Sequence, residues 1–314
     1  MLQVVDKIEV EMNDSITPLV SVLMTAYNRE KYIGEAIESV LASNFRDFEL
    51  IIVDDCSSDN TVAIAKDFEK LDKRIKVYVN EKNLSQFVNR NRAAALSTGK
   101  YIKYLDSDDI MYPNCLTISF EAMEAYPDAA VGAEHKSFAA KLPICYLPHE
   151  SYVNHYFKNN PLLFTGPTDC IFRRDIFMSF GGFDESIGIL SDTLLMLKLA
   201  NVYKVVGYET NLTYYRMHDN QVTIGQLNWA AMLIERNQIN WLVLNDSNCP
   251  LNETENKILK RNLKNILVRN LFYRTSKNNF SEARIVYKKT GLKLLDCFLA
   301  ILPNKKIKER NFVN

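Results

Sequence analysis

The sequence has no excess of charge of either sign, because 38 lysines and arginines balance 38 aspartates and glutamates over 314 residues. General nucleic-acid binders carry a basic excess, so we expect no nucleic-acid partner. The six cysteines are widely spaced and form no Cys-x-x-Cys pair. This spacing argues against zinc-ribbon and redox motifs and favours buried thiols in a reducing compartment.

Long apolar runs are also missing. No stretch reaches the roughly 20 uninterrupted apolar residues of a transmembrane helix. Residues 1–17 carry scattered acidic side chains in place of the basic flank and apolar core of a signal peptide. We therefore expect a cytoplasmic protein, with peripheral contact to the inner face of the plasma membrane as the only form of membrane association.

In the first half of the chain, segments with the apolar spacing of strands alternate with segments that have the apolar spacing of helices. Apolar runs of strand length occur at residues 19–26, 48–53, 75–79 and 101–105, and segments with helical spacing separate them. One of these helices is expected to begin after Asp59 as its cap and to run to about residue 69. The alternation predicts βαβ units and a mixed, mainly parallel α/β sheet flanked by helices.

The alternation of strand-like and helix-like segments becomes irregular after residue 129, where prolines interrupt the chain up to about residue 168. A helix near 192–200 and short strands near 203–206 and 212–215 follow, and from about residue 226 the pattern is helical. We divide the chain into an N-terminal extension, an α/β domain in two halves and a C-terminal helical region: residues 1–17, 18–128 with 129–224, and 225–314.

Three polar clusters directly follow predicted strands. The strongest is the run from Asp106 to Asp109, which contains three carboxylates within four positions. Clustered carboxylates repel one another unless a cation compensates, and hard oxygen ligands suit Mg²⁺ or Mn²⁺ bridging to phosphate. A polar turn in which Asp109 caps the next helix is the plainer alternative.

The other two clusters are Asp54-Asp55 after the second strand and residues 25–28 after the first. Each alone is an ordinary strand-to-helix loop. In parallel sheets, however, ligands bind beyond the carboxyl ends of the strands, so three such loops on neighbouring strands would surround one crevice.

Together these clusters resemble the motifs of family 2 glycosyltransferases with the GT-A fold. Further matches follow in the same order: the loop around Gly182, Phe183 and Asp184, a helix opening at Asp192, and Arg216-Met217-His218. The resemblance covers about residues 18–224, and it assigns the first half of the domain to the nucleotide sugar and the second half to the acceptor.

The resemblance implies a nucleotide-diphosphate sugar as donor, with a UDP-sugar expected. Within the donor site it assigns the base to Asp55, support of that residue to Asp54, and the ribose to Asp106. It implies that Asp108, with Asp106 and His218, holds the Mn²⁺ or Mg²⁺ cofactor. The complete set expected at the nucleotide and donor is Thr25, Tyr27, Glu30, Asp54, Asp55, Arg90, Asn91, Asp106 and Ser107.

On the acceptor side the resemblance implies contact through Gly182, Phe183 and Asp184. An attacking hydroxyl must lose its proton, and Asp192 is the expected base in a single displacement with inversion. The family usually has an acidic residue where this chain has Ser191, so Asp184 or Glu185 remains the alternative base. The expected acceptor is a glycan or lipid-linked saccharide in surface polysaccharide or glycolipid synthesis.

Three other functions share part of this sequence pattern. A sugar-nucleotide nucleotidyltransferase needs a glycine-rich, basic loop after the first strand, which this sequence lacks. An aspartyl phosphatase would use Asp106 as nucleophile but would have Thr or Val where Ile110 stands. The third alternative is a non-catalytic module that binds nucleotide sugars or glycans. Its only support is Ser191, which stands where the family usually has an acidic residue.

The C-terminal segment 292–310 combines an apolar stretch with basic residues. This pattern predicts peripheral contact with an anionic membrane, a helix packed on the core, or a contact between two copies in a homodimer.

Overall fold

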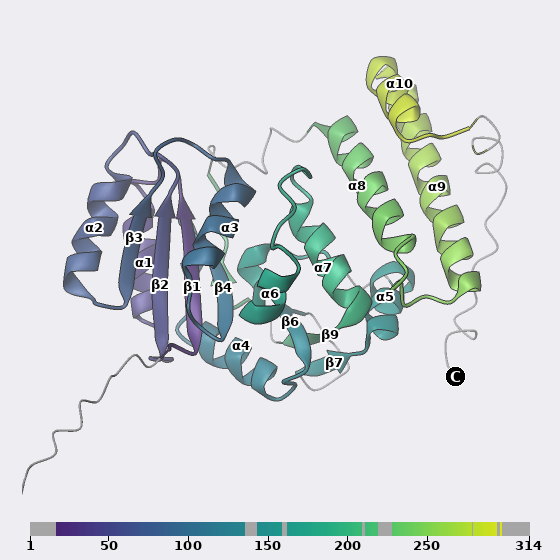
Figure 1. The fold of residues 1–314 in the computed structure, drawn as a ribbon. Helices are drawn as coiled ribbons and strands as arrows, with labels where there is room; N and C mark the ends of the chain where they lie inside the picture. The colour runs from purple at the N-terminus through teal and green to yellow at the C-terminus, as the bar shows by residue number, and fades with distance from the viewer. Residues whose placement is uncertain are drawn as a thin grey trace, which may run out of the picture.

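The structure is a computed structural model that describes residues 17–135, 143–158, 162–208, 211–218, 228–277, 279–293 and 296. An eight-stranded sheet with the strand order β3-β2-β1-β4-β8-β6-β9-β7 forms its centre (Figure 1). This mixed, mainly parallel sheet with helices on both sides confirms the predicted fold class.

The first half of the sheet is parallel. Strand β1 pairs with β2 and β4 on its two sides, and β2 pairs with β3. The strands are β1 (Val20–Ala26), β2 (Phe48–Asp54), β3 (Ile75–Val79) and β4 (Tyr101–Asp106). The connecting helices are α1 (Ile33–Leu41), α2 (Thr61–Leu71) and α3 (Gln86–Leu96). The carboxyl ends of β1, β2 and β4 therefore meet at one edge.

The second half extends the same sheet. Strand β8 runs antiparallel to β4, and β6, β9 and β7 follow outward. These strands are β6 (Ala129–Glu134), β7 (Ile144–Tyr146), β8 (Cys170–Arg173) and β9 (Lys204–Tyr208). The helices of this half are α4 (Cys115–Glu124), α5 (Pro148–Phe157), α6 (Arg174–Ser179) and α7 (Ser191–Val202). A short 3₁₀ turn, η1 (Pro167–Asp169), precedes β8.

A two-stranded sheet lies beside the main one. It pairs β5 (Ile110–Met111) with β10 (Thr213–Tyr214), so a segment late in the chain returns to the turn that follows β4.

Both faces of the sheet are covered, which explains the continuous apolar runs of its strands. In β1, Val22 and Met24 pack against α1 on one face, and Leu23 packs with α3 residues on the other. Helices α1 and α2 therefore contribute to one apolar cluster, and α3, α6 and α7 contribute to the second.

The C-terminal helices are α8 (Trp229–Leu244), α9 (Glu253–Ser276) and α10 (Phe280–Lys289). They share an apolar cluster of their own, and α8 also packs against the main core through Ile239 and Val243. Helix α9 begins at Asn252 with a capping box that Glu255 completes. Within the described residues no helix is both long and apolar enough to cross a membrane.

The membrane and dimer predictions for residues 292–310 fall almost entirely outside the described residues. At the start of this segment Leu292 is buried in the C-terminal cluster, and Asp296 accepts a hydrogen bond from Lys264 at 3.3 Å.

Several elements differ from their predicted positions. Helix α2 begins at Thr61 after Asn60, although Asp59 still accepts the Thr61 amide at 3.0 Å, and the helix continues to Leu71. Strand β6 and helix α5 lie in the stretch where the pattern had loosened. The reason is local composition: the β6 sequence AAVGAE has few β-branched or aromatic residues and α5 begins at a proline.

Candidate active site

The loops after β1, β2 and β4 line one pocket of about 330 Å³. Its position at the carboxyl ends of parallel strands is the one expected for a ligand site in an open α/β sheet. The lining residues are Thr25, Ala26, Tyr27, Arg29, Asp55, Asn83, Ser85, Gln86, Asn89, Arg90, Asp106, Ser107, Asp108 and Tyr215.

Asp55 is held rigidly at the end of β2. Its Oδ1 accepts hydrogen bonds from Asn80 Nδ2 at 2.6 Å and Leu84 N at 2.8 Å, and its Oδ2 accepts one from Ser85 N at 3.1 Å. The neighbouring Asp54 points elsewhere and accepts both the amide and the hydroxyl of Ser57. Asp55 thus presents a fixed carboxylate to the pocket, and Asp54 shapes the loop behind it.

Backbone strain is concentrated in these loops. Asn28, Cys56 and Ser85 adopt positive φ angles of 52°, 67° and 79°. Non-glycine residues in this region carry a cost that the surrounding structure must offset, and such residues cluster at functional sites. Their occurrence after β1, after β2 and before α3 is consistent with a ligand site.

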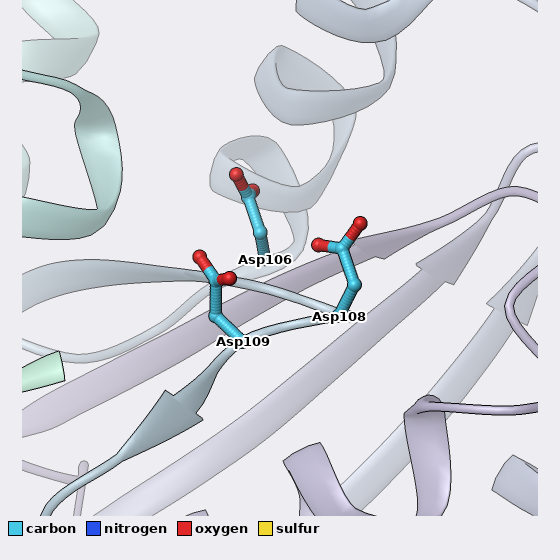
Figure 2. A group of neighbouring side chains, drawn as sticks. All are labelled: Asp106, Asp108 and Asp109. Carbon is cyan, nitrogen blue, oxygen red and sulfur yellow. The ribbon is translucent and has the colours of Figure 1, made fainter. Parts of the chain in front are cut away.

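The acidic cluster follows β4. Single ligand atoms of Asp106, Asp108 and Asp109 lie within 4.8 Å of one another, and Figure 2 shows the three carboxylates projecting to the same side of the loop. Asp106 Oδ1 accepts a hydrogen bond from Arg90 Nη2 at 2.5 Å. Asp108 Oδ2 lies 3.0 Å from both Arg29 Nε and His218 Nε2. Positive side chains thus compensate two of the three carboxylates.

Asp109 is almost fully buried. Burial, followed by the nearby charge of Asp106, raises the pKa of its carboxyl to about 7. Its Oδ1 accepts the amide of Arg216 at 3.1 Å, whereas its Oδ2 has no hydrogen-bond partner among the described residues. Asp109 therefore ties the late segment 213–218 to the acidic cluster.

The same late segment is held by aromatic and ionic contacts. The His218 ring stacks on Tyr32 with 4.7 Å between ring centroids, and the Arg216 guanidinium lies over the Tyr32 ring at 5.2 Å. Arg216 also pairs with Glu35 at 2.5 Å. These contacts with residues near the start of α1 bring His218 to Asp108.

The residues present fit a divalent cation. Carboxylate oxygens are the preferred ligands of Mg²⁺ and Mn²⁺, and three carboxylates with one imidazole nitrogen converge here. Asp109 Oδ2 is buried and has no hydrogen-bond partner in the described part of the chain, so the cluster has an oxygen that a cation could satisfy.

Asp192 lies at the first turn of α7, in the second half of the domain. Its Oδ1 accepts the amide of Thr193 at 2.6 Å. Burial raises the pKa of its carboxyl, and the charge of Arg90 partly opposes this shift. Burial of Arg90 by itself lowers the pKa of its guanidinium, but the charge and hydrogen bond of Asp106, together with smaller contributions from Tyr104 and Asp192, raise that pKa overall. Arg90 thus interacts electrostatically with both Asp106 and Asp192.

The loop from Gly182 to Glu185 is held by α3 and α7. Asn91 bonds to both the amide and the carbonyl of Phe183, and its Nδ2 donates to Glu185 Oε1 at 3.1 Å. Ser191 is fully buried and donates its hydroxyl to the Asp184 carbonyl at 2.9 Å. In this chain, Ser191 therefore anchors the loop.

Most residues named from the sequence for the donor site line the pocket: Thr25, Tyr27, Asp55, Arg90, Asp106 and Ser107; the predicted metal ligand Asp108 lines it too. Three others contact neighbouring loops. Glu30 accepts the Asn60 amide at 3.0 Å, Asp54 bonds to Ser57, and Asn91 bonds to Phe183.

Arg29 and Tyr215 also line the pocket, although no role was predicted for either from the sequence. The only sequence signal for Arg29 was its position directly after Tyr27-Asn28. Tyr215 stood within the late motif Tyr215-Arg216-Met217-His218, of which only His218 was expected at the site.

The sheet order, the pocket at the strand ends and the acidic cluster together define the GT-A class of fold. Residues 21–181 match the family model described as glycosyl transferase family 2. The chain belongs to this family.

Curated relatives support this membership. An uncharacterized glycosyltransferase of Haemophilus influenzae is 28% identical over 241 residues, covering 71% of this chain and 74% of that protein. The Methanocaldococcus jannaschii protein MJ1057, an uncharacterized glycosyltransferase, is 44% identical over 109 residues, or 34% of this chain. A Bacillus subtilis glycosyltransferase provisionally named TuaG, for teichuronic acid biosynthesis, is 46% identical over 92 residues, or 29% of this chain. The matches cover only 38% and 36% of the last two proteins.

Solved structures share the fold. Residues 1–349 of Staphylococcus aureus TarS in complex with UDP-GlcNAc match with a TM-score of 0.66 and 21% identity, over 90% of this chain and 81% of that one. The mannosyltransferase PcManGT of Pyrobaculum calidifontis, in complex with GDP-Man and Mn²⁺, matches with a TM-score of 0.60 and 15% identity, over 91% and 79%.

Proposed function

We propose that this chain is a metal-dependent, inverting glycosyltransferase that passes a sugar from a nucleotide-diphosphate donor to a hydroxyl group. The observation that carries the proposal is the convergence of Asp55, Asp106 and Asp108 on one pocket, from the ends of two strands of the sheet.

The donor side follows from the fixed carboxylates. Asp55, held by three hydrogen bonds, is suited to accept a hydrogen bond from a nucleotide base, and Thr25 and Tyr27 line the pocket beside it. Asp106 is proposed to bind the ribose. A UDP-sugar is the proposed donor, a choice supported by the UDP-GlcNAc complex of the related TarS fold.

Asp108, with Asp106 and His218, is proposed to hold Mn²⁺ or Mg²⁺. Such an ion, when bound, neutralises the negative charge that develops on the leaving diphosphate. The Mn²⁺ complex of PcManGT supports a metal in this fold. The role of Asp109 is structural, because its carboxylate accepts the Arg216 amide and so holds the segment that carries His218.

The acceptor hydroxyl is proposed to lose its proton to the Asp192 carboxylate as its oxygen attacks the anomeric carbon from the face opposite the diphosphate. Because burial raises the pKa of Asp192, this carboxylate is a stronger base than an exposed aspartate. Asp184 is a weaker candidate, since a hydrogen bond from the Ser186 hydroxyl lowers the pKa of its carboxyl. Gly182 and Phe183 shape the proposed acceptor side.

A glycan or lipid-linked saccharide is the proposed acceptor, in surface polysaccharide or glycolipid synthesis. The support is the similarity to a protein named for teichuronic acid biosynthesis.

Thermal-shift measurements with a panel of nucleotide sugars test the proposal. We expect one nucleoside diphosphate sugar to raise the melting temperature with Mn²⁺ present, and EDTA to remove the effect. Each stabilising donor is then incubated with candidate acceptors, and the product's anomeric configuration is read by NMR. Stabilisation by no nucleotide sugar, or hydrolysis of phosphomonoesters instead, would refute the proposal.

A further inference from the structure

One oxygen of Asp108 is shared by two nitrogen groups. Its Oδ2 accepts a hydrogen bond from Arg29 Nε at 3.0 Å and lies 3.0 Å from His218 Nε2. The side chains of Arg29 and Asp108 are only 19% and 12% exposed, so water screens this ion pair weakly.

This arrangement opposes metal binding at Asp108. A guanidinium in contact with a carboxylate neutralises the charge that attracts a cation, and it repels a second positive charge nearby. A divalent ion that takes Oδ2 of Asp108 as a ligand therefore has to displace Arg29 from that oxygen. His218 need not move, because a neutral imidazole is itself a metal ligand.

The contacts of Arg29 allow its side chain to move away from Asp108 while its backbone stays in place. Its amide donates to Thr61 Oγ1 at 2.7 Å, which fixes the main chain to the start of α2. The remaining guanidinium bonds go from Nη1 to the backbone carbonyls of the exposed residues Tyr27 and Asn28, at 3.1 and 3.3 Å. These weak contacts leave the side chain free to turn within the pocket that it lines.

The second arginine of the cluster behaves differently. The Arg90 side chain is only 3% exposed and pairs with Asp106 at 2.5 Å. Moving a buried guanidinium away from the carboxylate that it pairs with leaves a poorly compensated buried charge, which is strongly unfavourable. Arg90 is therefore a fixed partner, and Arg29 is the exchangeable one.

We propose that Arg29 is an exchangeable counter-cation: it compensates Asp108 while the pocket is empty and turns to the nucleotide's diphosphate once a metal occupies Asp108. Guanidinium groups bind phosphate oxygens through paired hydrogen bonds, so the side chain exchanges one anionic partner for another. This inference rests on the proposed function and adds a positioning residue to it.

The proposal requires two effects of opposite sign from one substitution. In Arg29→Gln, Mn²⁺ alone should bind about tenfold more tightly, because its competitor for Asp108 is gone. With saturating Mn²⁺, UDP should bind about tenfold more weakly, because a phosphate-binding group is gone. Titration calorimetry and electron paramagnetic resonance of free Mn²⁺ measure both constants. Arg29→Lys keeps the charge but loses the paired hydrogen bonds, so it should restore only part of the UDP affinity.

The control is Arg46→Gln, which removes one exposed arginine outside the pocket and should change neither constant. Unchanged or weaker Mn²⁺ binding by Arg29→Gln would overturn the exchange, as would unaltered UDP affinity. If the wild-type chain binds neither Mn²⁺ nor UDP, the proposed function itself fails. If it binds both and Arg29→Gln behaves like Arg46→Gln, only the role of Arg29 fails.

Discussion

The side-chain amide of Asn91 forms two hydrogen bonds with the backbone of Phe183. Its Oδ1 accepts the Phe183 amide at 2.9 Å, and its Nδ2 donates to the Phe183 carbonyl at 2.8 Å, across 92 residues of sequence. Asn91 lies on α3 next to Arg90, which lines the donor pocket. The loop from Gly182 to Glu185 is thereby fixed to the helix that borders the pocket.

Gly182 makes this contact possible, and its replacement by Ala should break it. Its φ is +70°, and an added Cβ would lie 2.5 Å from Asn91 Oδ1. Gly182→Ala should lower the free energy of unfolding by about 2–3 kcal/mol, combining left-handed strain with loss of the Asn91 bonds. Chemical denaturation measures this change.

Gly181→Ala is the matched control. Its φ is +80°, but a Cβ there meets no atom within 4 Å, so it should cost only the strain of about 1 kcal/mol. Equal losses for the two variants would show that the Asn91 contact does not limit stability.

Asp108→Asn should abolish the stabilisation that Mn²⁺ confers, because an amide lacks the charge that binds a hard cation. Thermal shifts with Mn²⁺ and UDP, with and without EDTA, measure this effect. Asp67→Asn on the surface of α2, where the side chain is 71% exposed, should keep the full shift. A persisting EDTA-sensitive shift in Asp108→Asn would place the metal elsewhere.

Asp192→Asn should keep donor binding and lower the transfer rate by about a hundredfold to ten-thousandfold, the usual range for a general base. The wild-type rate should fall as the pH drops through the pKa of Asp192, which burial raises above its ordinary value, because protonation removes the base. Rates of the Asp184→Asn and Glu185→Gln variants provide the comparison. Near-normal transfer by Asp192→Asn would assign the base to another carboxylate.

His155 on α5 should make stability depend on pH. Burial, together with the charge of Arg236, lowers the pKa of its imidazole to about 4. The unfolded chain takes up this proton near pH 6.5, before the folded chain does, so stability is full above pH 6.5 and falls toward pH 4. At pH 4.5 the resulting loss of stability amounts to about 2–3 kcal/mol.

His155→Phe removes that titration and should flatten the corresponding part of the curve. Urea unfolding of both chains between pH 4.5 and 7.5 supplies the comparison. Parallel pH profiles would show that His155 is not a source of the dependence.

The sequence alone determined the parallel half of the sheet and the position of the acidic cluster. These features are local: an apolar run covered on both faces needs no distant information to be recognised, and the polar residues at its end follow directly. It also indicated the order of the later motifs, through the resemblance of short segments. Strand β6 was not predicted, because its alanine-rich sequence has no pattern typical of a strand. It is a strand because it pairs with β8 and β9.

The tertiary structure decided which charges pair directly. Asp108 lies 79 residues from Arg29, and nothing in the sequence predicted this ion pair; its proximity to His218, 110 residues away, was expected only through the family resemblance. Which carboxylates are free and which are paired depends on how loops and helices pack, because ionic contacts act through space and carry no periodic sequence signature. The sequence therefore predicted that the carboxylates lie at the strand ends. Their ionic partners were determined by the packing of α1, α3 and the late segment 213–218.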